Sequence, residues 1–90
     1  MAQTEFEQLV QVVKALRDPE TGCPWDLQQD HKSLLPFLFE ESYEYKEAVE
    51  SGDFDHMQEE IGDVLLQVVL HSQLANEAGK FNIESVSKTI

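Results

Sequence analysis

The chain has 90 residues, enough for one domain and too few for two, so we expect a single domain over residues 1–90. It carries 18 Asp and Glu against 6 Lys and Arg, a formal net charge of −12. This charge disfavours nucleic-acid binding, which depends on basic side chains that neutralise phosphates. An acidic protein still binds a phosphate-bearing small molecule when a divalent cation lies between the two.

Cysteine usage and the first residues indicate the compartment. The single cysteine, Cys23, has no partner for an intramolecular disulfide and is expected to be a small buried side chain. Met1 to Glu7 has neither the basic start nor the apolar run of a signal peptide. The longest apolar run, Val64 to Leu70, is far shorter than the roughly 20 residues of a membrane span. We therefore expect a cytoplasmic protein with no membrane segment.

Four helices are predicted in chain order. Thr4 and Glu7 have the spacing of a capping box, which predicts a first helix from about residue 5 to Arg17. Two prolines and a glycine then predict a loop over residues 18–26. The remaining helices are predicted at residues 34–50, at residues 56–78, and from Asn82 to the end of the sequence, which cuts the last helix short. No segment has a strand pattern, so the expected fold is an all-α antiparallel helical bundle.

The inward face of the helix at 34–50 carries two acidic side chains. At about 100° per residue, Glu41 points along the middle of the apolar stripe, and Glu44 lies three residues on, close enough to converge with it. The stripe within roughly 80° of Glu41 comprises Leu34, Phe37, Leu38, Tyr45, Ala48 and Val49.

The longest predicted helix repeats this arrangement. Glu60 and Asp63 are also three residues apart, and they share a face with Gln67, His71 and Leu74. Four acids can then converge between two antiparallel helices.

Four inward carboxylates need compensation, because taking an ionised carboxylate out of water is costly even after relaxation. The segment from Glu40 to Asp63 contains only one Lys or Arg, Lys46. A divalent cation is the simplest compensator, and oxygen-only ligation favours Mg²⁺, with Mn²⁺ as a substitute, over Zn²⁺. A di-iron bundle would need Glu-x-x-His on two helices, and no Glu here has a His three residues later.

An acidic run of this kind is also typical of a solvated helix face. That interpretation is preferred for Glu40, Glu47 and Glu50, which point more than about 90° away from the stripe. It stays open for Glu60 and Asp63, whose helix is apolar almost all around. The predicted metal site therefore depends on the two carboxylate pairs together.

The spacing of the acids matches a known motif. Glu40-Glu41-x-x-Glu44, fifteen further residues, and Glu60-x-x-Asp63 resemble the EExxE and ExxD motif of the all-α nucleoside triphosphate pyrophosphohydrolases. Four surrounding segments resemble the amino-terminal type of domain in the MazG branch of that superfamily, so that the resemblance covers nearly the whole chain: Leu16 to Glu20, Gly22 to Asp26, His31 to Leu34, and Glu59 to Val69.

This resemblance implies Mg²⁺-dependent hydrolysis of nucleoside triphosphates to the monophosphate and pyrophosphate, with the metal on Glu41, Glu44, Glu60 and Asp63. Glu44 is expected to be needed for turnover, and Glu40 is a candidate for orienting or deprotonating the attacking water, with a solvated carboxylate as the alternative. Relatives of this type continue into a basic tail that residues 1–90 do not include, and some carry two such domains, one of them weakly active. A catalytically silent nucleotide- or metal-sensing dimer module is therefore the alternative function.

Three residues outside the motif are candidates for substrate contact. Trp25, held by a proline in a loop, could stack on a nucleobase, although a lone loop Trp also commonly anchors its loop to the core. Lys32 and His31 could meet phosphate or ribose at the mouth of the site, with Lys32 preferred for phosphate.

The helix at 56–78 has more apolar surface than a small bundle can cover. We therefore expect a homodimer or a higher homo-oligomer, and we place Val69, opposite the carboxylate face, in its interface.

Overall fold

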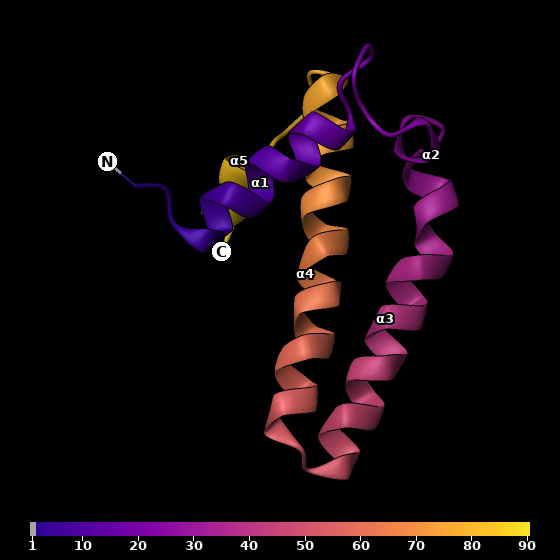
Figure 1. Cartoon of the computed structure of the whole chain (residues 1–90), viewed down its shortest axis with the longest axis vertical. Coiled ribbons are helices and arrows are strands. Elements are labelled where there is room, and N and C mark those ends of the chain that lie inside the picture. The colour runs from indigo at the N-terminus through magenta and orange to yellow at the C-terminus, as the bar shows by residue number, and fades with distance from the viewer. Residues whose placement is uncertain (1) are drawn as a thin grey trace.

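The computed structural model describes residues 2–90, which form five helices and no strand (Figure 1). They are α1 (Glu5–Leu16), α2 (Pro24–Leu27), α3 (His31–Ser51), α4 (Phe54–Glu77) and α5 (Ile83–Lys88). The prediction of an all-α helical bundle is confirmed. Within the described part of the chain, no helix has the length and apolar character to cross a membrane.

Helices α3 and α4 form a long antiparallel pair with the most extensive helix–helix contact in the molecule (Figure 1). Gly52 ends α3 with a φ of 75°, in the left-handed region that a side chain disfavours. The Asp53 side chain then accepts hydrogen bonds from the backbone N–H groups of Asp55 and His56 and so begins α4. This tight turn sets the acidic middle of α3 against the first half of α4.

The apolar core lies toward the other end of this pair. Helix α1 crosses α4 there, and α5 also packs on α4 (Figure 1). The buried cluster consists of Val13, Leu34, Val69 and Leu70, surrounded by the partly buried Leu9, Val10, Leu66, Leu74 and Ile83. The carboxylate half of the α3–α4 pair is thus separate from the main core.

The prediction that Val69 lies in a dimer interface is wrong. Its side chain is only 2% exposed and belongs to the core cluster with Val13 of α1. Helix α1 packs on α4 and buries the face that the sequence pattern left uncovered.

The start of α3 and the end of the predicted loop differ from their predictions. Helix α3 begins at His31, three residues early, because Asp30 and Ser33 form a capping box in which each side chain bonds the backbone N–H of the other. Pro36 consequently lies in the second turn of α3, where its missing N–H deprives only the carbonyl of Lys32 of a helical partner. The last residues of the predicted loop, 24–26, belong to the short α2, which begins at Pro24, a residue suited to a first helical position.

Candidate metal centre

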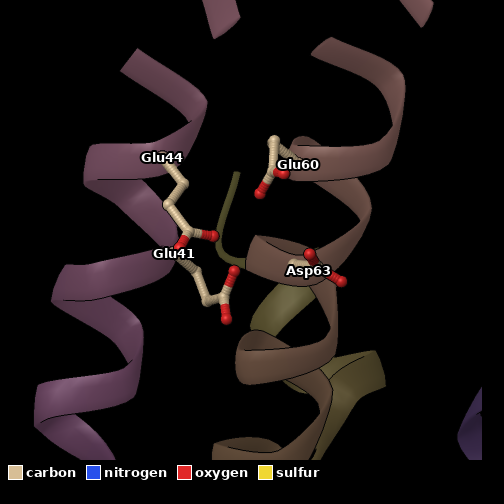
Figure 2. A group of neighbouring side chains, drawn as sticks. All are labelled: Glu41, Glu44, Glu60 and Asp63. Atoms are coloured by element: carbon tan, nitrogen blue, oxygen red, sulfur yellow. The ribbon is translucent and has the colours of Figure 1, made fainter. Parts of the chain in front are cut away.

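The four carboxylates predicted to converge do so between α3 and α4 (Figure 2). Glu41 and Glu44 extend from α3, and Glu60 and Asp63 extend from α4. Each side chain offers one carboxylate oxygen to the cluster, and these four oxygens all lie within 4.8 Å of one another. The separation of three residues within each pair places both acids of a helix on the face that meets its neighbour.

The cluster resists full ionisation. Burial, followed by the charges of Asp63 and Glu44, raises the pKa of Glu41 to about 7. Burial and a hydrogen bond with Glu44 raise the pKa of Glu60. Among residues 2–90, neither a Lys nor an Arg forms an ion pair with the cluster, and its basic neighbour is His56, whose Nε2 lies 3.3 Å from Glu60 Oε1.

Two carboxylate oxygens of the cluster are buried without a hydrogen-bond partner, namely Oε2 of Glu41 and Oε2 of Glu60. Buried polar atoms are normally paired with protein groups, water or ions. A divalent cation would supply the missing positive charge, and a set made of oxygens alone suits Mg²⁺ or Mn²⁺. The residues present therefore fit such a cation.

Glu40 does not join the cluster, although it is adjacent to Glu41 in sequence. Its side chain is exposed on α3, because successive residues of a helix point about 100° apart.

His56 contacts the cluster through Glu60, although the sequence analysis did not include it among the site residues. Its spacing of four residues from Glu60 is the signal that predicts such a contact on a helix.

Trp25 lies on α2 and contacts α3. Its ring meets Phe37 edge to face, with centroids 5.6 Å apart and planes at 77°, and the residue remains 48% exposed. The contact anchors the indole to α3, and about half of the residue remains exposed to solvent. Cys23, the residue that precedes α2, is only partly buried, so the prediction of a buried filler is wrong.

His31 and Lys32 occupy the first turn of α3, and both are exposed. The Nδ1 atom of His31 lies 2.8 Å from Nδ1 of His71 on α4. This contact was not predicted, because it joins residues 40 positions apart.

Similar known proteins identify the family of this chain. Residues 29–90 match the model of the MazG nucleotide pyrophosphohydrolase domain. A protein of Thermotoga maritima named nucleoside triphosphate pyrophosphohydrolase/pyrophosphatase MazG is 54% identical over 94% of this chain and 33% of its own length. Proteins named nucleoside triphosphate pyrophosphohydrolase from Escherichia coli and Mycobacterium tuberculosis are 40% and 42% identical, over 96% and 93% of this chain and 33% and 26% of their own lengths. The chain thus spans about a third or less of these relatives, and it belongs to the MazG nucleotide pyrophosphohydrolase family.

Proposed function

We propose that residues 1–90 form a cytoplasmic enzyme unit that hydrolyses nucleoside triphosphates to nucleoside monophosphate and pyrophosphate, with Mg²⁺ as its cofactor. The observation that carries this proposal is the convergence of four carboxylates within 4.8 Å, at a place with no Lys or Arg ion pair among the described residues. The names of the relatives from three bacteria support the same reaction.

We assign a role to each residue from its position. Glu41, Glu44, Glu60 and Asp63 would hold the cation, which when bound would offset the repulsion between triphosphate and carboxylates and polarise the phosphoryl oxygens. Glu40, which is exposed and outside the cluster, is the candidate base for the attacking water, with a solvated carboxylate as the alternative.

The remaining contacts would lie at the α2 end of α3. The exposed part of Trp25 would stack on the base, and Lys32 and His31 would contact ribose or phosphate at the mouth of the site.

Phosphorus NMR of the products tests this function. With Mg²⁺ or Mn²⁺, nucleoside triphosphates should give monophosphate and pyrophosphate, and Ca²⁺ or a chelator should stop the reaction, because Ca²⁺ accepts longer and looser coordination. Glu44→Gln should abolish turnover, whereas Glu47→Gln, at an exposed position on the same helix, should retain it. Release of orthophosphate and diphosphate would contradict the assignment.

A second candidate function is a catalytically silent nucleotide- or metal-sensing module. The short match to the relatives favours this function. The chain matches about a third of their length, and the activity in their names can reside in the other two thirds. Binding of Mg²⁺ and nucleotide without release of any product would identify this module.

We also propose that a second copy of the chain covers an exposed apolar stripe on α4. Ile61, Leu65 and Val68 lie on one side of the helix and are 44%, 39% and 37% exposed. Their spacing of four and then three residues forms a continuous surface. A homodimer or higher homo-oligomer would bury it.

A further inference from the structure

A row of polar side chains continues from the carboxylate cluster along α4. Glu60, Asp63, Gln67 and His71 fall within about 80° on one face of the helix, which is the face that meets α3. Gln67 is only 7% exposed, and its Oε1 atom is buried without a partner. The Nε2 atom of His71 is likewise buried and unpaired.

These unpaired atoms are costly to the fold. A buried polar group without a partner forfeits its hydrogen bonds to water and weakens the native state. An apolar side chain of similar size at either position would avoid that cost. Because they continue directly from the candidate metal centre, these atoms point to a bound molecule that supplies their partners.

The pairing of His71 with His31 determines which kind of ligand group could bond to the Nε2 atom of His71. The ring centroids are 5.1 Å apart and the two Nδ1 atoms are 2.8 Å apart, so one Nδ1 donates to the other and the accepting ring is neutral. Burial, followed by the charge of His31, lowers the pKa of His71, which favours its neutral form. His71 therefore offers a hydrogen bond through Nε2 without a positive charge. Such a group suits a hydroxyl or the edge of a base better than a phosphate.

The aromatic pair lies at the same level of the α3–α4 hairpin. Phe37 precedes Glu41 by four residues on α3, and Gln67 follows Asp63 by four residues on α4. Because the helices are antiparallel and Glu41 interacts with Asp63, both positions lie about one turn from the cluster, in the same direction. Phe37 carries the edge-to-face contact of Trp25.

We propose that Gln67 and His71 form the subsite for the nucleoside part of the substrate and bond its base edge or its ribose hydroxyls. The triphosphate lies at the carboxylate cluster, and the nucleoside extends along α4 over the next two turns. This inference rests on the proposed function, because it requires the triphosphate to bind at the cluster.

Calorimetry with two kinds of probe tests the subsite. The probes are the α,β-methylene analogues of the four common ribonucleoside triphosphates, which keep the nucleoside and resist cleavage, and inorganic tripolyphosphate, which lacks it. All are titrated with Mg²⁺ into the parent, Gln67→Leu and His71→Leu. Each variant should weaken the best-bound analogue by about tenfold, as expected for a lost hydrogen bond, and should change tripolyphosphate affinity by less than about twofold.

A matched control separates the subsite from general effects on α4. Gln73→Leu makes the same substitution on the same helix, where the side chain lines a different cavity of about 180 Å³ with Val10 and Asn82, and it should leave every affinity unchanged. If Gln67→Leu does not fold by circular dichroism, Gln67→Met keeps the side-chain length and takes its place.

The outcomes separate the inference from the proposed function. Unchanged analogue affinity in both variants would overturn the subsite, whereas binding of the analogue by the parent would remain consistent with a triphosphate at the cluster. Equal losses for analogue and tripolyphosphate would also overturn it, because the substitutions would then be acting on the cluster. A parent chain that bound neither probe would contradict the proposed function itself.

Discussion

The guanidinium of Arg17, at the end of α1, donates two hydrogen bonds to the carboxylate of Glu77, at the end of α4. Arg17 Nε donates to Glu77 Oε2 at 3.0 Å, and Nη2 donates to Oε1 at 2.8 Å. Arg17 Nη1 also donates to the backbone carbonyl of Asp26 and, at 3.4 Å, to that of Gln29. The Arg17 side chain, only 10% exposed, thus ties the segment that carries Trp25 to the ends of α1 and α4.

Replacement of Glu77 by Ala should lower the free energy of unfolding by about 2 kcal/mol, because it leaves a mostly buried guanidinium without its carboxylate partner. Urea unfolding measures the change. Glu50→Ala is the control, since Glu50 pairs with Lys46 where both side chains are 62% exposed, and its effect should stay below about 0.5 kcal/mol. Equal effects of the two substitutions would contradict a structural role for the Arg17 pair.

The same pair gives a pH dependence with a definite sign. The hydrogen bond from Arg17 lowers the pKa of Glu77 below its ordinary value of 4.5. Its stabilisation is therefore complete above that pH and is lost as the pH falls through the folded pKa. Acid unfolding of the parent should show this loss, and Glu77→Ala should lack it.

Gly22 is required by close backbone contacts. A Cβ there would lie 2.4 Å from the carbonyl oxygen of Leu16 and 2.5 Å from that of Asp18. Gly22→Ala should therefore displace the loop before α2 and cost about 1 to 3 kcal/mol. Gly62→Ala is the control, because a Cβ in that helical position meets nothing within 4 Å, and it should stabilise the fold by about 0.5 to 1 kcal/mol. Thermal melting compares them, and destabilisation by both would refute the argument.

Glu41 should make the metal-free protein less stable as the pH rises. Its pKa is raised from 4.5 to about 7, so the folded state holds this proton more tightly than the unfolded state does. The stability that it contributes is present below pH 4.5 and is lost as the pH rises through 7. Between about pH 5 and pH 8, Glu41→Gln should gain about 1 kcal/mol relative to the parent, a modest value because solvent screens a partly exposed site.

Only the difference in stability between Glu41→Gln and the parent reports on the pKa of Glu41. The lowered pKa of His71 produces the opposite trend, since its neutral folded form gains stability as the pH rises. Melting curves in chelator at both pH values give the difference. A difference in stability between Glu41→Gln and the parent that did not change with pH would contradict a raised pKa at Glu41.

Two substitutions on α4 separate the core from the proposed association surface. Val69→Asp should unfold the chain, because an unpaired charge would enter the buried cluster with Val13. Leu65→Asp, on a side chain that is 39% exposed, should leave the helical content intact and break association. Sedimentation and circular dichroism distinguish these results, and a parent chain that sediments as a stable monomer would refute the dimer.

The carboxylate cluster was predictable because it depends on helix phase and on the antiparallel pairing of two consecutive helices. Glu41 and Glu44 lie on an apolar stripe, and the turn at Gly52 makes α3 and α4 antiparallel, so that Glu60 and Asp63 can meet them. Val69 was placed wrongly because its burial depends on where α1 crosses α4, and no periodicity within α4 encodes that crossing. The contact between His31 and His71 likewise depends on the register between two helices.

The start of α3 shows a limit of a different kind. Pro36 pointed to a helix that begins at Leu34, whereas the reciprocal bonds of Asp30 and Ser33 begin it at His31. A local cap outweighed the single backbone hydrogen bond that the proline removes.

Calorimetric titration of Mg²⁺ into the nucleotide-free chain tests most directly whether the four carboxylates are a metal centre. The parent and Glu47→Gln, whose side chain is exposed on α3, should bind the ion with equal affinity. Glu41→Gln should bind it at least about tenfold more weakly, because it removes a charged ligand from a cluster whose oxygens lie within 4.8 Å of one another. Binding of Mg²⁺ by Glu41→Gln as tightly as by the parent would contradict the metal centre.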